Sequence, residues 1–315
     1  MKRLAVSLIG AAFAFAAAAQ SFPHKTVRFV SGVTPGAASD TMARILAEKL
    51  AAVLGQPVIV ENRLGAGGLV GARYVAQQAE PDGHTIMMYA SAFTVSTLLT
   101  PGLDPKELTP VATVATIPTV LITPPGKYKT AADFVAAAKA QNGNLVCADA
   151  GIGSATHMAF ERFRFAAGFK ATNVHTKGPG EALTEVISGR AQCYFALVFQ
   201  AKKMHESGKV SALVVSSPKR SSLMPELPTT VEAGYPNSDY NFWVGALVSS
   251  KTPRDIVERL HKEIDALVQS PEISEQIRKL GADPLTMSIA DFQGMIDREL
   301  VDNAKLIKAA GIKAN

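Results

Sequence analysis

Short apolar runs rich in β-branched residues alternate with amphipathic stretches along most of the chain. This alternation is typical of strands and helices that build a parallel α/β fold. The pattern predicts strands at 27–30, 58–60, 85–88, 145–148, 172–175, 192–195, 211–215 and 240–248. It predicts helices at 41–54, 155–167, 180–188, 200–207, 253–269, 271–280 and 288–309, with one more after the loop at 65–68.

Two proline-bearing segments, 117–119 and 225–228, interrupt the alternation. We expect the chain to cross from one lobe to another and back at these points. The division places 22–122 and 225–315 in the first lobe and 123–224 in the second. Two lobes joined by a double crossover form a hinged clamshell, and the cleft between them is the expected place for a ligand.

The N-terminus combines a basic start with an uncharged run. Lys2 and Arg3 precede sixteen uncharged residues, 4–19, that are rich in alanine and end in small residues. This arrangement is typical of a secretory signal peptide, and the run is short for a bilayer span. We predict that residues 1–20 are a signal peptide and that the mature chain is periplasmic. Losing Lys2 and Arg3 lowers the formal net charge from +5 to +3.

The composition limits the partners. The 315 residues are 47% hydrophobic, enough for two cores, and the mild positive charge is not clustered, so we expect no nucleic acid. Export permits a disulfide between Cys147 and Cys193, but buried cysteines are as often inert apolar residues, and the sequence leaves their pairing open. Two cysteines without a neighbouring histidine pair do not predict a zinc site, and we expect neither a metal nor a cofactor.

One glycine loop, GAGG at 65–68, nearly matches the dinucleotide-binding fingerprint. Val70 occupies the place of the third glycine, and no acidic residue lies at 86–90 to bind a ribose. We therefore interpret these glycines as a tight turn.

Two other loops resemble each other. TPGAASD at 34–40 and GIGSAT at 151–156 each combine small residues with hydroxyls where a predicted helix begins. Small residues let an oxygen-bearing ligand approach the backbone amides, and the helix dipole favours a negative charge there. Asp40 is interpreted as an N-cap or hinge anchor. One such loop on each lobe would hold an anion from both sides.

Catalysis has little support in the sequence. Ser154 and His157 share one face at a helix start, but there is no G-x-S-x-G elbow, H-E-x-x-H motif or P-loop. A secreted hydrolase using Ser154 stays open as an alternative, as does a two-lobed ligand sensor for a membrane signalling protein.

Several sequence blocks together carry a family resemblance that covers the whole chain. VENRLGAGG at 60–68, PDG at 81–83 and GIGSATH at 151–157 make the chain resemble the Bug-type extracytoplasmic solute receptors of the tripartite tricarboxylate transporter class. The resemblance implies a type II periplasmic binding-protein fold with two α/β lobes. It also implies that the loops at 35–40 and 151–157 hold a ligand carboxylate, which the receptor delivers to membrane permease subunits without chemistry.

Departures from the family pattern bear on the ligand. Ala37 and Ala38 stand where many members have glycines, and 196–199 lack the aspartate that often meets a ligand ammonium. We therefore expect a dicarboxylate or an aromatic carboxylate, bound by a monomer. The predicted ligand-binding residues are Ala37, Ala38, Ser39, Asp40, Ser91, Phe93, Gly153, Ser154, Ala155, Thr156, His157, Lys177, Ala196, Phe199 and Phe242. Tyr194 and Trp243 could extend an apolar wall or pack in a core.

Overall fold

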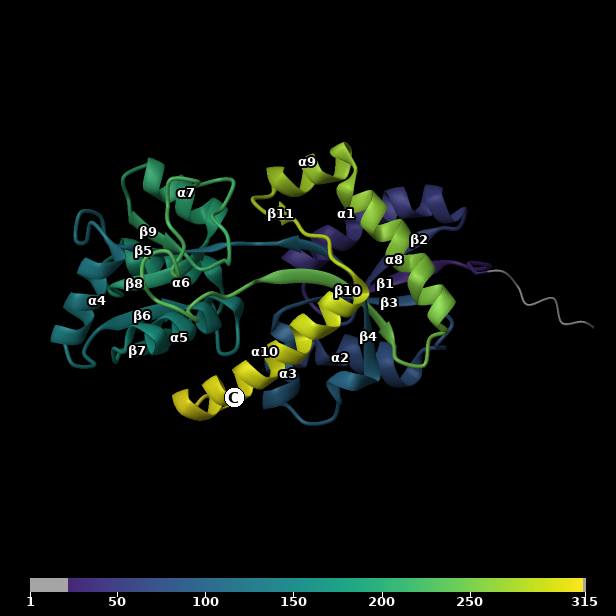
Figure 1. The fold of residues 1–315 in the computed structure, drawn as a ribbon, viewed down its shortest axis with the longest axis horizontal. Helices are drawn as coiled ribbons and strands as arrows, with labels where there is room; N and C mark the ends of the chain where they lie inside the picture. Colours follow the sequence, from purple (N-terminus) through teal and green to yellow (C-terminus); the bar gives the residue numbers. More distant parts are fainter. Residues whose placement is uncertain (1–21, 314–315) are drawn as a thin grey trace, which may run out of the picture.

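The computed structural model describes residues 22–313, which form two α/β lobes side by side (Figure 1). The predicted signal peptide, residues 1–20, lies outside the described residues. Within 22–313, no helix combines the length and the apolar character that a membrane crossing needs.

The first lobe is built on a six-stranded sheet. Its strands lie in the order β11 (Asp283–Pro284), β4 (Leu108–Thr116), β10 (Trp243–Ser249), β3 (Thr85–Ala90), β1 (Val27–Ser31) and β2 (Val58–Asn62). The apolar faces of α1 (Ala38–Leu54), α8 (Arg254–Gln269) and α9 (Pro271–Lys279) pack in a core on one side of the sheet. Those of α2 (Leu69–Arg73), α3 (Ala92–Leu99) and α10 (Ile289–Ala310) pack in a core on the other.

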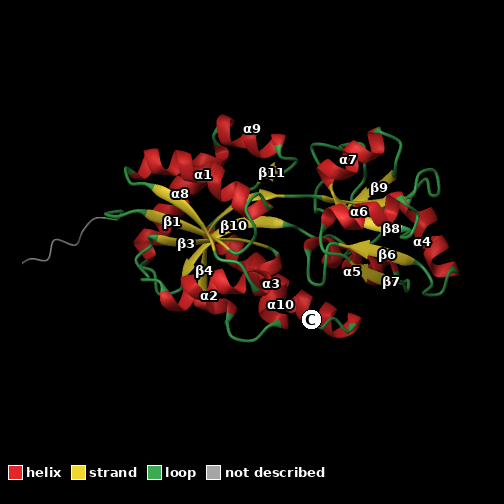
Figure 2. Ribbon diagram, turned by 180° about the vertical axis from the view of Figure 1, so that it is seen from behind, coloured by secondary structure: helices red, strands yellow, loops and turns green. Residues whose placement is uncertain are grey.

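The second lobe is built on a five-stranded sheet. Its strands lie in the order β7 (Thr172–His175), β6 (Val146–Asp149), β8 (Cys193–Leu197), β5 (Thr119–Thr123) and β9 (Ser211–Val215). Helices α4 (Ala131–Ala140) and α5 (Ala155–Ala167) share one core with this sheet, and α6 (Pro179–Ile187) and α7 (Val198–Glu206) share another. Figure 2 shows both lobes with helices around a central sheet.

Both sheets are mixed rather than wholly parallel. β10 is antiparallel to β3 and β4, and β5 is antiparallel to β8 and β9. The chain enters each of these two strands directly from the neighbouring lobe. They therefore run away from the junction between the lobes, whereas β1, β3, β6 and β8 run towards it.

The chain passes between the lobes twice, and the two passages are hydrogen-bonded to each other. The first lies at residues 117–118, between β4 of the six-stranded sheet and β5 of the five-stranded sheet. The return lies just before β10, where the amide of Ile117 donates to the carbonyl of Phe242 at 2.8 Å. The segment 225–228 lies within the second lobe instead, because the Pro228 carbonyl accepts from the amide of Val215 at the end of β9.

Helix α10 belongs to both lobes. Near its start, Phe292 and Ile296 pack in the first lobe, whereas Leu306 packs against the core of the second. In the middle, the buried carboxylate of Glu299 accepts a hydrogen bond from the Trp243 indole at 3.0 Å. Figures 1 and 2 both show α10 running along the two lobes, so it forms a third connection between them.

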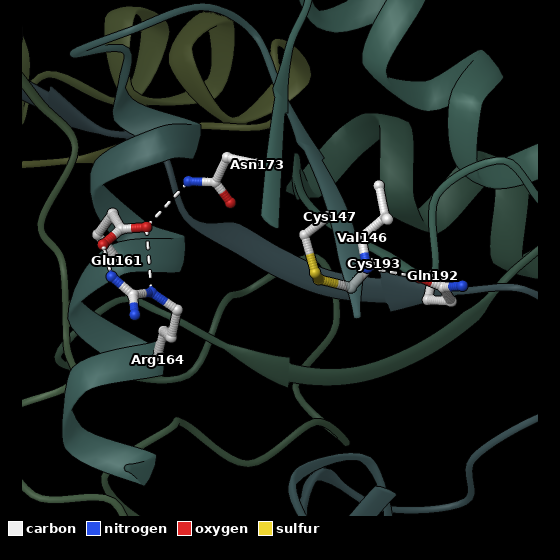
Figure 3. Close-up of a disulfide and its surroundings, with 7 residues drawn as sticks. All are labelled: Val146, Cys147, Glu161, Arg164, Asn173, Gln192 and Cys193. Atoms are coloured by element: carbon white, nitrogen blue, oxygen red, sulfur yellow. Dashed lines mark hydrogen bonds and ion pairs between the residues drawn. A yellow bond between two sulfur atoms is a disulfide. The ribbon is translucent and has the colours of Figure 1, made fainter. Parts of the chain in front are cut away.

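Cys147 and Cys193 form a disulfide (Figure 3). The two residues are register partners on the parallel neighbours β6 and β8, and their Cα atoms lie 4.6 Å apart. Next to them, the amide of Val146 donates to the side-chain oxygen of Gln192 at 2.7 Å. The disulfide therefore links two neighbouring strands of the second lobe, close to the loop that follows β6.

Candidate ligand-binding site

A cavity of about 640 Å³ lies between the lobes, where strands of both sheets end. Ligands of open α/β sheets bind outside the carboxyl ends of the strands, which is where this cavity lies. The first lobe lines it with Thr34, Pro35, Gly36, Ala37, Ala38, Thr41, Met42, Ile117, Phe242 and Leu280. The second lobe lines it with Ala150, Ser154, Ala155, Thr156, Pro179, Leu197, Phe199 and Gln200.

The first lobe presents the start of α1 to the cavity. The N-cap residue, Ala37, makes no side-chain cap, so the first amides of the helix have no partner within it. Ala38, the first helical residue, lines the cavity. The small side chains here leave room for a ligand oxygen to approach those amides.

Asp40 holds this loop in place from behind. Its carboxylate is fully buried and accepts from the amide of Gly36 at 2.8 Å, the Arg44 guanidinium at 2.9 Å and the Asn62 amide at 2.7 Å. Burial acts to raise the pKa of this carboxyl, but the three hydrogen bonds outweigh it, so the pKa lies below its usual value. Asp40 is charged at neutral pH and anchors the loop. The prediction that it could be the N-cap is wrong, because the N-cap of α1 is Ala37 and Asp40 lies in the first turn of the helix.

The second lobe presents the start of α5. Three side chains that flank its loop each accept from one loop amide, at distances of 2.8 to 3.0 Å. They are Asp149 with Gly151, Thr156 with Ala150, and His157 with Gly153. The helix is capped by the hydroxyl of Ser154, which accepts from the amide of His157. The loop is thereby fixed, and Ala155 and Thr156, the first residues of α5, line the cavity. The first amides of a helix have no partner within it.

His157 is part of this support. The ring is buried, and burial lowers its pKa, although the nearby carboxylates Asp149 and Glu161 oppose the shift. In the neutral ring, Nδ1 accepts from Gly153, so Nε2 carries the hydrogen.

His157 also packs edge-to-face against His175, whose Nδ1 lies 2.8 Å from Asp149. Asp149, His157 and His175 lie close enough together to suggest a metal site. The lone pair of His157 is already used on Gly153, however, so the three form a hydrogen-bonded support for the loop.

The structure brings seven of the predicted ligand-binding residues to the cavity. They are Ala37, Ala38, Ser154, Ala155, Thr156, Phe199 and Phe242. Gly153 directly precedes them in the second loop, and Ser39, Asp40 and His157 are buried behind the two loops.

The remaining predicted residues lie elsewhere. Ser91 is buried and its hydroxyl lies 2.9 Å from that of Tyr240, while Phe93 and Ala196 are fully buried in cores. Lys177 is exposed, and its backbone amide donates to Glu181. Tyr194 and Trp243 are core residues too. Ala196, Tyr194 and Trp243 lie on strands, whose residues alternate between two faces, so nearness in sequence to the cavity did not bring these side chains into it.

Several residues that line the cavity were not predicted from the sequence. Thr41 and Met42 belong to the first turns of α1, Ile117 to the first passage, and Gln200 to the start of α7. Thr41, Met42 and Gln200 lie within about one helical turn of a loop or strand end already singled out, and that position is the signal that could have found them. Leu280 lies far away in sequence, directly after α9, and only the tertiary fold brings it to the cavity.

The two lobes, the double passage and the cavity between helix starts define a two-lobed solute-binding protein. The family model described as the tripartite tricarboxylate transporter family receptor matches residues 42–312. The chain therefore belongs to that receptor family, and the family and fold class predicted from the sequence are confirmed.

Relatives and solved structures agree with this assignment. A protein of Pseudomonas sp. strain P51, named for the tcbD-tcbE intergenic region, is 32% identical over 83% of this chain and 79% of its own length. Protein BugT of Bordetella pertussis is 29% identical over 98% of this chain and 97% of its own. The structure of R. palustris Rpa4515 with adipate has a TM-score of 0.78 at 29% identity, covering 93% of this chain and 99% of that one. MatC from Rhodopseudomonas palustris with bound malate has a TM-score of 0.74 at 28% identity, covering 91% and 100%.

Proposed function

We propose that this protein is a periplasmic receptor that captures a small carboxylate between its lobes and delivers it to a tripartite tricarboxylate-type permease. Export rests on the predicted signal peptide, and delivery rests on membership of the receptor family. We further propose that the protein works as a monomer and that binding brings the lobes together around the hinge at residues 117–118 and 241–242.

The observation that carries this proposal is the meeting of two helix starts at one cavity. Ala38 in the first turn of α1 and Ala155 in the first turn of α5 both line it, one from each lobe. Each helix start carries about half a positive elementary charge, so together they match one carboxylate. Hydroxyls of Thr41, Ser154 and Thr156 line the same cavity and add hydrogen-bond donors.

The ligands of similar proteins support the same class of compound. The neighbours named above were solved with adipate and with malate, and both ligands are small carboxylates. A receptor of the same family and fold is expected to bind a carboxylate of its own.

The hydrolase alternative finds less support in the geometry. The Ser154 hydroxyl accepts a hydrogen bond from the backbone amide of His157, and Nδ1 of the His157 imidazole accepts one from the amide of Gly153. A serine nucleophile needs an imidazole that removes its proton. Here both groups instead hold the loop.

The proposal is tested by calorimetry on the mature chain with pairs of carboxylates and their uncharged amides. The acid should bind at least about tenfold more tightly than the amide, because only the acid gains charge-assisted bonds at the two helix starts. The ligand that binds should also raise the melting temperature.

A matched pair of variants locates the site. Ala38→Leu places a bulky side chain in the cavity and should abolish binding, whereas Ala52→Leu, on the exposed face of the same helix, should not alter it. If acid and amide bind equally, or if Ala38→Leu binds like the wild type, the carboxylate proposal is wrong.

A further inference from the structure

The two lobes contact each other on two sides of the junction. On one side, α10 runs along both lobes, and Gly153 of the loop before α5 packs against Val95 of α3. On the other side, the turn between α9 and β11 meets residues of α7 and of the segment that follows β9. Figures 1 and 2 both show α9 and β11 on the side away from α10. The chain passes between the lobes elsewhere, so this second contact can part when the lobes move.

Gly281 allows the lobes to come close at this turn. It lies just after α9 with a φ of +77°, and a Cβ placed on it would lie 2.7 Å from the Cβ of Phe199 and 3.2 Å from Leu223. Carbon atoms pack at about 3.5–4.0 Å, so position 281 has no room for a side chain. Because Phe199 lies in the first turn of α7, the helix backbone fixes its Cβ. A side chain at position 281 would therefore push the second lobe away from the first.

A hydrogen bond lies beside this close contact. The hydroxyl of Ser222, in the second lobe, donates to the carboxylate of Asp283 in β11 of the first lobe. Hydrogen bonds to a carboxylate are stronger than those between neutral groups. Asp283 is held in place by the sheet, because it pairs with Thr116 at the end of β4. The two lobes are thus joined here by one packing contact and one hydrogen bond.

The same contact lies at the rim of the ligand cavity. Phe199 and Leu280 both line the cavity, and they are 43% and 41% exposed. Side chains that line the cavity and also reach solvent stand where the cavity meets the outside. If the lobes separated at this point, the cavity would open to water.

We propose that Phe199, Ser222, Gly281 and Asp283 form a clasp that stabilises the closed arrangement of the lobes. In that arrangement the starts of α1 and α5 meet at one cavity. The clasp therefore raises the fraction of molecules that can hold a ligand from both sides, and weakening it lowers the apparent affinity. The effect on affinity rests on the proposed function, whereas the contact between the lobes does not.

Gly281→Ala and Gly208→Ala form a matched pair that tests the clasp. Gly208 follows α7 in the same kind of turn, with a φ of +70°, and each glycine amide donates to the carbonyl three residues earlier at 2.9 Å. Alanine is strained at both positions because φ is positive. A Cβ at Gly208 meets nothing within 4 Å, however, so only Gly281→Ala also pushes the lobes apart.

The first measurement is small-angle scattering of the mature chain without ligand. Gly281→Ala should have a larger radius of gyration than the wild type, whereas Gly208→Ala should match the wild type. Both variants should lose similar stability in urea, because they carry the same backbone strain. If the two variants have the same radius of gyration, the clasp inference is wrong.

Ser222→Ala tests the hydrogen bond without straining the backbone. Calorimetry with adipate and malate as probes should show an affinity about two- to tenfold lower than in the wild type. Ser188→Ala is the control, because the Ser188 hydroxyl is exposed and bonds within its own lobe, so affinity should not change. Equal affinities for Ser222→Ala and the wild type would contradict the clasp.

The two proposals fail in different ways. If no carboxylate binds to the folded wild type, the proposed function is wrong, and scattering alone decides whether the clasp exists. If Gly281→Ala does not fold, Ser222→Ala replaces it in the scattering experiment, because it changes only one exposed hydroxyl. It should then have a larger radius of gyration than Ser188→Ala, and equal values would overturn the inference.

Discussion

The two loops at the cavity present the same kind of helix start, but they are held in different ways. The loop before α1 depends on one buried carboxylate, Asp40, which accepts from Gly36 and is itself held by Arg44 and Asn62. The loop before α5 is held by three separate side chains, each of which accepts from a different loop amide.

This difference determines which substitutions and which change of pH should disturb each loop. A single substitution can release the first loop, whereas the second should lose only part of its support. The second loop, however, depends on a neutral histidine, His157. It should therefore respond to pH nearer neutrality than the first, whose anchor is a carboxylate with a lowered pKa.

The largest effect is expected from Asp40→Asn. The substitution removes the charge that Arg44 and the loop amide pair with, so the free energy of unfolding should fall by about 2–3 kcal/mol. Ligand affinity should fall as well, because the loop is no longer held. Because the folded-state pKa is lowered, the contribution of Asp40 is fully present at neutral pH. It is lost only as the pH falls below the ordinary value near 3.8.

Urea unfolding and calorimetry on the same preparations measure both quantities. Asp255→Asn is the control, because Asp255 lies in the first turn of α8 and is exposed, so it should affect stability much less. If the two variants lose equal stability, Asp40 is not an anchor.

A smaller effect is expected from His157→Leu. The amide of Gly153 loses its acceptor, which should cost about 1–2 kcal/mol at pH 7. The folded-state pKa is lowered below 6.5, so in the wild type the unfolded state binds the proton first. The histidine contribution to stability should therefore shrink as the pH falls from 7 to 5, and the gap between wild type and variant should narrow.

The measurement from pH 7 to pH 5 has to compare the free energies of unfolding of the wild type and His157→Leu, because Glu299 titrates in the same range. Burial raises its pKa to about 7, so its contribution has the opposite sign and stability falls as the pH rises towards 7. Glu299 is present in both proteins and cancels in the difference. A gap that stays constant from pH 7 to 5 would contradict the role given to His157.

The sequence predicted most of the elements, because most strands and helices here show one regular period. The helix at 155–167 and the strands at 172–175 and 211–215 have the predicted bounds. β4 and β5 were missed because they are buried along nearly their whole length and therefore show no alternation, and because Pro110 interrupts β4. The antiparallel direction of β5 and β10 follows from lobe-to-lobe connections that local patterns do not encode.

At the site, the sequence identified the two loops but not the rest of the wall. Hydroxyls and small residues at a helix start are a local pattern, which is why Ala38, Ser154 and Thr156 were named. Which face of a strand or helix meets the cavity is decided by packing, so Phe93 was named although it lies in the core. Leu280 reaches the cavity from a distant block, and the pairing of Cys147 with Cys193 depends on the strand order.

The smallest effects should come from a pair of threonines, one in each lobe, that line the same cavity. Thr156 accepts from the loop amide of Ala150 at 3.0 Å, whereas the Thr41 hydroxyl bonds to no other residue within 22–313. Thr156→Val should therefore lower the free energy of unfolding by about 1 kcal/mol as well as weaken binding. Thr41→Val should leave unfolding within about 0.5 kcal/mol of the wild type while lowering carboxylate affinity about five- to tenfold. Denaturation and calorimetry on both variants separate support of a loop from contact with the ligand. If Thr41→Val destabilises the protein as much as Thr156→Val does, or leaves affinity unchanged, the two loops do not divide these roles.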